Sequence, residues 1–176
     1  MLILLAQDRG TKKRSGQEHL PLMLWHHVRM ATPAMATAAG ALRGYMAEWL
    51  GSAPASEQEA AALVEAGLPN GVVQKFLDRG LSRNEVFELI LPLRTWKHRK
   101  ARQEPLSVTE SERALRAARL LAQARQVMGE PEQAMAWVRA PKRRFEGRSP
   151  LQMMATEPGG RLVEEMLVQI DEGMFA

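Results

Sequence analysis

The strongest constraint on the fold of this chain is a repeated signal for where helices begin and end. A Ser or Thr followed three residues later by Glu or Gln can satisfy two free backbone amides at a helix N-terminus. Four such pairs precede apolar segments: Ser56 with Glu59, Ser82 with Glu85, Thr109 with Glu112, and Ser149 with Gln152. No segment alternates apolar and polar residues with the period of two that a half-buried strand shows. The sequence therefore predicts an all-α protein.

Helix starts and breakers divide the 176 residues into parts. We expect a flexible N-terminal segment at 1–19, a helical module at 20–104 and a second helical module at 105–176, joined by a linker at 104–108. The 45% of hydrophobic residues is enough to form a core. The longest helix is expected to follow the linker, with Thr109 as its cap, and to end at Gly129.

Other helices are predicted from proline and glycine positions. A short helix is expected within 20–28, and a longer one from Pro33 to Gly51, although Gly40 and Gly44 weaken this second prediction because glycine disfavours helix interiors. The last helix is expected to end at Gly173. Its apolar face is expected to contain Leu162, Val163, Met166, Leu167 and Ile170.

Composition argues against several classes of function. The chain has no cysteine, so it forms no disulfide and no thiolate site, which fits a cytoplasmic protein. Neither a signal peptide nor a membrane-spanning segment is predicted. His26 and His27 are adjacent and would diverge on a helix, so we expect no metal site and no cofactor. No nucleophile–base–acid set or phosphate-binding loop is found, so we do not expect an enzyme.

The segment 80–102 is expected to form two helices around a tight corner at Pro92. The second of them, 93–102, carries five Lys or Arg residues and no acid. Leu93 and Trp96 are three residues apart and can hold this helix on the protein while the cations face outward. A capped helix, a corner and a cationic helix together match a reader of the DNA major groove. A solvated cationic surface is the alternative explanation.

Two other features suggest partners. The loop 142–148 is a second basic cluster, which can contact an acidic partner or be a plain solvated loop. Met174 and Phe175 form an apolar tail after the last predicted helix, and such a tail can insert into a pocket of a partner. The acidic residues near it can imitate the charge of an anionic ligand.

Several motifs resemble a known family. The first set lies near the C-terminus: Trp137-Val138-Arg139-Ala140-Pro141, Gly147-Arg148-Ser149-Pro150-Leu151, Thr156-Glu157-Pro158-Gly159-Gly160, Val163-Glu164, Leu167 and Ile170-Asp171-Glu172-Gly173-Met174. This set resembles the C-terminal toxin-binding domain of the Xre/MbcA/ParS antitoxin family. The second set is Gly80-Leu81-Ser82-Arg83, Leu91-Pro92-Leu93-Arg94-Thr95-Trp96 and Arg99-Lys100. It is similar to the Xre-like helix-turn-helix of that family.

The resemblance implies the antitoxin of a type II toxin–antitoxin operon. Such a protein is expected to mask the active site of a RES-domain toxin that degrades NAD, to form a homodimer through its N-terminal module, and to bind operator DNA to repress its own operon. The expected DNA-binding residues are Arg83, Arg94, Thr95, Lys97, His98, Arg99, Lys100 and Arg102. The expected toxin-binding residues are Arg148, Ser149, Glu164, Leu167, Asp171, Glu172, Gly173, Met174, Phe175 and Ala176.

Two other functions stay open at this stage. The chain can be a stand-alone DNA-binding regulator whose C-terminal module only forms oligomers. A small enzyme is the least favoured alternative, for want of a catalytic set of residues. A RES-type reading frame beside the gene would favour the antitoxin.

Overall fold

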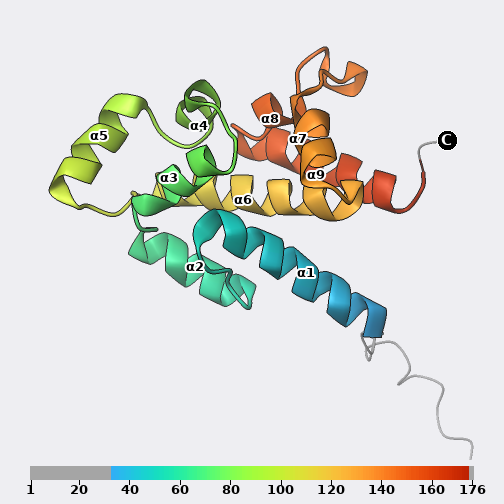
Figure 1. Ribbon diagram of the computed structural model, residues 1–176, viewed down its shortest axis with the longest axis horizontal. Coiled ribbons are helices and arrows are strands. Elements are labelled where there is room, and N and C mark those ends of the chain that lie inside the picture. Colours follow the sequence, from blue (N-terminus) through green and yellow to red (C-terminus); the bar gives the residue numbers. More distant parts are fainter. Residues whose placement is uncertain (1–32, 175–176) are drawn as a thin grey trace, which may run out of the picture. The chain divides into compact units, whose positions relative to one another are not determined.

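A computed structural model describes residues 33–174, and every regular element in this range is a helix (Figure 1). This confirms the predicted fold class. The expectations for 1–19, 20–28, the three N-terminal histidines, Phe175 and Ala176 lie outside the described residues. The helices are α1 (Pro33–Leu50), α2 (Glu57–Ala66), α3 (Gly71–Asp78), α4 (Arg83–Leu89), α5 (Leu93–Arg102), α6 (Val108–Met128), α7 (Pro131–Arg139), the 3-10 turn η1 (Arg143–Phe145), α8 (Pro150–Met153) and α9 (Glu157–Asp171).

Three of the four predicted caps begin helices. At α4 the Ser82 hydroxyl accepts from the Glu85 amide at 3.3 Å, and the Ser82 amide donates to the Glu85 carboxylate at 2.7 Å. Ser149 and Gln152 make the same reciprocal pair at α8. At α2 the Ser56 hydroxyl accepts from the Glu59 amide, but the Glu59 carboxylate accepts from Ala55 instead of Ser56.

The fourth predicted cap was wrong. Helix α6 begins two residues earlier than expected, because Ser107 forms the reciprocal pair with Glu110, at 3.3 and 2.8 Å. Ser111, expected inside the Thr109 capping pattern, lies instead on a buried face of α6. Its hydroxyl accepts a 2.9 Å hydrogen bond from the Leu68 amide. The chain before α6 is also held, since the Leu106 amide donates to the Leu68 carbonyl at 2.8 Å.

Helix α6 lies at the centre of the described residues. It contacts α1 and α2, and it also contacts α7 and α9 (Figure 1). Alanine allows this close packing because its side chain is a single methyl group, so neighbouring helices approach from several directions. Five alanines of α6 are fully buried: Ala114, Ala117, Ala118, Ala122 and Ala124. One apolar core contains residues from α1, α3, α4, α6, α7, α8 and α9. The division of the chain at 104/105 stays a prediction.

Two glycines allow α9 to lie against its neighbours. A Cβ atom on Gly160 would lie 2.8 Å from Cδ of Arg116 on α6. A Cβ atom on Gly159 would overlap the backbone carbonyl of Met153, which a rotamer change cannot relieve. Small residues here are therefore required by packing. In the described range, no helix is both long enough and apolar enough to cross a membrane.

We expect Gly159→Ala to lower the free energy of unfolding by about 1–3 kcal/mol, because α8 and α9 must separate to accept the methyl group. Chemical denaturation measures this loss. The matched control is Gly40→Ala in α1, where nothing lies within 4 Å of the added Cβ. This control should stabilise the protein by about 0.5–1 kcal/mol, the helix preference of alanine over glycine. Equal effects of the two substitutions would contradict the packing argument.

Candidate functional site

The basic helix α5 turns most of its cations to solvent. Its N-terminus follows Pro92, whose fixed φ breaks the chain direction after α4. Trp96 is buried and Leu93 is half-buried, so these two side chains hold α5 on the protein as expected. Exposed on the other faces are Arg94, Lys97, His98, Lys100 and Arg102, while Thr95 is half-buried. Four of the five Lys and Arg residues of α5, together with His98, therefore form an accessible basic surface.

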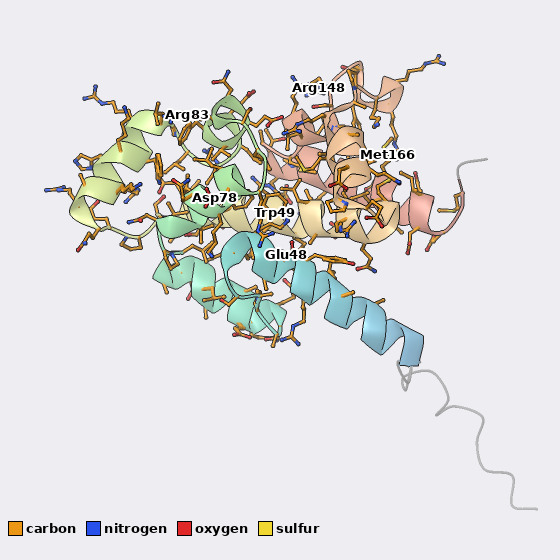
Figure 2. All side chains as sticks on the ribbon, in the orientation of Figure 1. Glu48, Trp49, Asp78, Arg83, Arg148 and Met166 are labelled. Atoms are coloured by element: carbon orange, nitrogen blue, oxygen red, sulfur yellow. The ribbon has the colours of Figure 1, made fainter. Side chains whose placement is uncertain are left out.

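An aromatic pair fixes the corner between α4 and α5. The rings of Phe87 and Trp96 lie 5.5 Å apart at an angle of 41°. The guanidinium of Arg83 lies 5.7 Å from the centre of the Phe87 ring, and the Lys100 ammonium 4.8 Å from that of Trp96. A cationic side chain held over an aromatic face loses some conformational freedom, but its charge stays available to an anionic partner. Arg83 on α4 thus joins the α5 cations on one corner (Figure 2).

Arg99, one of the predicted DNA-binding residues, makes structural contacts within the protein. Its Nε atom lies 2.8 Å from a carboxylate oxygen of Glu110, and its Nη1 atom donates to the Pro105 carbonyl at 3.2 Å. A second carboxylate, on Glu104, lies 3.7 Å away. The side chain is three-quarters buried in these contacts, so it joins α5 to the start of α6. The sequence did not show this, because Glu104 was expected in a linker and Glu110 in the first turn of a helix of the other module, and contact between the two segments depends on how they pack.

The inner face of α9 belongs to the core. Val163, Met166 and Leu167 are buried, and Leu167 has no exposed surface. Leu167 therefore packs inside the protein and does not present itself to a partner. Ser149 is also buried, and its hydroxyl is used as the cap of α8. Both residues support the fold of the predicted toxin-binding region.

The outer face of α9 is mixed apolar and acidic. Leu162, predicted on the inner face, is 40% exposed, because the inward stripe at 163, 166, 167 and 170 follows the helical period and leaves residue 162 outside it. Val168 is 41% and Met174 60% exposed. The acids on or just after this helix are solvent-accessible: Glu164, Glu165, Asp171 and Glu172. Sequence reasoning missed Leu162 and Val168 as surface residues, although the period alone separates them from the stripe.

A groove of about 460 Å³ runs beside this face. Leu42 and Met46 of α1 and Val127 of α6 form apolar parts of its lining. The α9 side contributes Val168 with Glu164, Asp171 and Glu172. Three of the predicted toxin-binding residues therefore share one groove, whereas Arg148 lies in the loop before α8.

Comparisons with known proteins identify the family. The "Antitoxin Xre/MbcA/ParS C-terminal toxin-binding domain" family matches residues 123–173, and the "Antitoxin Xre-like helix-turn-helix domain" family matches residues 59–119. The chain is 41% identical to Antitoxin Xre of Pseudomonas putida strain KT2440 over 119 residues, which cover 68% of this chain and 75% of that protein. The chain belongs to the Xre family of antitoxins. This confirms the resemblance found from the motifs.

A more distant relative carries another description. The antitoxin is 32% identical over 97 residues to a protein of Sphingobium sp. strain YBL2 named Prs ADP-ribosylating antitoxin. This match covers 50% of the chain and 61% of the relative. The two family matches meet inside α6, so this helix serves both the helix-turn-helix domain and the toxin-binding domain.

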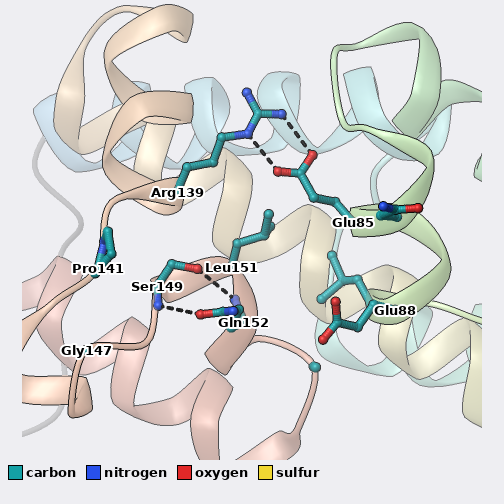
Figure 3. Close-up of a pocket in the computed structure, with 11 residues that line it drawn as sticks. Glu85, Glu88, Arg139, Pro141, Gly147, Ser149, Leu151 and Gln152 are labelled. Carbon is teal, nitrogen blue, oxygen red and sulfur yellow. Dashed lines mark hydrogen bonds and ion pairs between the residues drawn. The ribbon is translucent and has the colours of Figure 1, made fainter.

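An ion pair joins the two matched regions of the antitoxin (Figure 3). The Arg139 guanidinium of α7 contacts both carboxylate oxygens of Glu85, with Nε at 2.7 Å and Nη2 at 2.9 Å. Nη2 also donates to the Gly80 carbonyl at 2.7 Å. The hydrogen bond from Arg139 is the main reason that the pKa of Glu85 is lowered, and the same contact raises the pKa of Arg139. Glu85 also caps α4, so one carboxylate fixes both the helix start and its neighbour.

We expect Glu85→Gln to lower the free energy of unfolding at pH 7 by about 1–2 kcal/mol, since the amide keeps the capping contact but loses the charged pair. The pKa of Glu85 is lower in the folded state, so its stabilisation is present above the pKa of the unfolded chain. It is lost as the pH falls through the folded pKa. Denaturation at several pH values should therefore show the two proteins converging in acid. The control Glu88→Gln removes an exposed acid without an ion pair among the described residues. A constant gap between wild type and Glu85→Gln at all pH values would refute the linkage.

Proposed function

We propose that this antitoxin neutralises a RES-domain toxin that degrades NAD, by covering its active site with the surface around the end of α9. The observation that supports this most is the mixed character of that surface. It combines the exposed apolar Val168 with the acids Glu164, Asp171 and Glu172 in the lining of one groove, and the exposed Met174 follows two residues after Glu172. An inhibitor needs a surface of this kind and no catalytic group.

Charge complementarity gives the proposal a physical basis. NAD is anionic, so an enzyme that binds it offers cationic groups to the pyrophosphate. Acids at the end of α9 can pair with those groups in place of the ligand. The apolar side chains between the acids supply the buried contact that holds an interface together.

The relatives are consistent with a toxin that uses NAD. The name of the Sphingobium relative includes ADP-ribosylation, a reaction that takes its ADP-ribose from NAD. A RES toxin that degrades NAD would use the same dinucleotide. The proposed partner of this antitoxin is therefore an NAD-consuming enzyme.

We also propose that the α4–α5 corner binds operator DNA, and that the chain represses its own operon as a homodimer in the cytoplasm. The exposed cations of α5 are spaced along one helix that a major groove can admit. Arg83 and Lys100 lie over aromatic rings beside that helix and suit phosphate contacts. A dimer would bring two such helices to two half-sites.

The first test concerns the toxin. We expect the double variant Asp171→Asn, Glu172→Gln to inhibit the NAD-degrading activity of the co-expressed toxin about tenfold more weakly than the wild type, because it removes two charges that face the toxin. Titration of the purified toxin with each antitoxin gives the inhibition constants. Deletion of residues 174–176 should weaken inhibition as well.

A matched control removes the same number of negative charges from residues outside the groove. Glu65→Gln with Glu132→Gln removes two exposed acids on α2 and α7, neither of which lines the groove. This control should inhibit as well as the wild type. If both double variants inhibit fully, the α9 surface does not bind the toxin, and the stand-alone regulator becomes the better interpretation.

The second test concerns DNA. We expect Arg94→Ala with Lys97→Ala to weaken binding to the DNA upstream of the gene at least tenfold. The slope of log affinity against log salt should fall by about 2, since each phosphate that a cation neutralises contributes about 0.9 to it. Fluorescence anisotropy at several salt concentrations measures both quantities.

Arg99→Ala provides the contrast within the same helix. Because Arg99 is paired with Glu110, its removal should lower the melting temperature, whereas the Arg94 and Lys97 variants should not. Unchanged DNA binding by the Arg94, Lys97 double variant would reject α5 as the DNA-binding element.

A further inference from the structure

The basic loop between α7 and α8 has a fixed backbone. The Gly147 amide donates to the Lys142 carbonyl and the Lys142 amide to the Arg148 carbonyl, each at 3.0 Å, so the loop is closed at its base. Phe145 is 2% exposed and anchors the middle of the loop in the core. Glu146 and Gly147 adopt positive φ values of 57° and 84°, which turn the chain back toward α8. The side chains of this loop therefore project from a defined scaffold.

Two of its four cations have no partner within residues 33–174. Lys142 lies 4.9 Å from the centre of the Trp137 ring, and burial lowers its pKa. Arg144 contacts Gln169 and lies 3.7 Å from a carboxylate oxygen of Glu165. Arg143 and Arg148 are exposed and make no ion pair and no side-chain hydrogen bond in the described range. Two guanidinium groups are thus available to an anionic partner.

The loop lies across a cleft from the helix-turn-helix. Asn84 of α4 and Gly147 of the loop line the same cleft of about 460 Å³ (Figure 3). Arg83 and Arg148 are the sequence neighbours of these two residues, and both lie along one edge of the view in Figure 2.

Acids near the cleft offset this charge only in part. In the lining of the cleft, Glu85 is paired with Arg139. The acids that remain near the cleft are Glu88, which lines it, and Glu146 in the loop. Exposed cations are therefore found in the segments on both sides of this cleft, with Arg83 next to Asn84 in the chain and Arg148 next to Gly147.

We propose that Arg143 and Arg148 contact DNA phosphates beyond the segment bound by α5, so that the toxin-binding domain takes part in DNA binding. This inference rests on the proposed binding of DNA by α4 and α5. A duplex carries phosphates along its whole length, and a guanidinium can contact two oxygens of one phosphate. Such contacts add affinity and position without adding sequence preference.

The sign of the charge favours DNA over the toxin as the partner of this loop. The proposed toxin surface on α9 is acidic, so the toxin face that complements it is cationic. A cationic toxin face would repel Arg143 and Arg148 if it extended to the loop. The family resemblance implies instead that Arg148 contacts the toxin, and this is the alternative outcome of the test.

The experiment uses the double variant Arg143→Ala, Arg148→Ala of the full chain. Its binding to two duplexes from upstream of its gene is compared with that of the wild type. One duplex ends at the segment protected by α5, and the other extends one helical turn beyond it. On the longer duplex we expect about tenfold weaker binding and a salt slope reduced by about 2. On the shorter duplex the double variant should match the wild type. Arg143→Lys with Arg148→Lys keeps the charges and should restore the slope.

The controls separate the possible failures. Arg43→Ala with Lys75→Ala removes two exposed cations on α1 and α3 and should leave both duplexes unaffected. If the loop variant keeps the wild-type slope while Arg94→Ala with Lys97→Ala reduces it, this inference is wrong and DNA binding by α5 stands. If neither variant changes DNA binding, both proposals fail. Weaker toxin inhibition by the loop variant, with unchanged DNA binding, would assign the loop to the toxin and overturn the inference.

Discussion

Close packing around α6 is the constraint on which the rest of the structure depends. Its buried alanines allow α1, α2, α7 and α9 to approach one helix from different sides. The two family matches divide within this helix, so the DNA-binding and toxin-binding regions share a structural element. Helix α6 packs against both α4, which begins the basic corner, and α9, which carries the acidic surface.

Charges of opposite sign are concentrated on different elements of this framework, although Arg144 of the basic loop reaches Glu165 of α9. Cations gather at the α4–α5 corner and in the loop before α8, whereas acids gather around the end of α9. Two acids that fall among the cations are paired, Glu85 with Arg139 and Glu110 with Arg99, whereas Glu88 and Glu146 make no ion pair in the described residues. This pairing joins elements of the fold, and it occupies two acids that would otherwise be available to the exposed cations.

Some side chains that suggest binding by their type are used for structure instead. Arg99, Ser149 and Leu167 belong to motifs of the family resemblance, yet they form an ion pair, a helix cap and part of the core. A motif records every residue that a domain needs, so it does not separate the residues that fold the domain from those that touch its partner. Burial and hydrogen bonding make that distinction here.

The sequence by itself determined the helical class, most helix ends and the family, because caps, breakers and the period of apolar residues are local signals. It also located the basic helix, since five cations without an acid are visible in ten residues. The tertiary structure decided which cations are free and that the Ser111 hydroxyl accepts a hydrogen bond from the Leu68 amide. It alone brought Arg139 to Glu85, 54 residues apart in the chain. Contacts of this range depend on how helices pack against α6, and packing is set by the whole core instead of by any short segment.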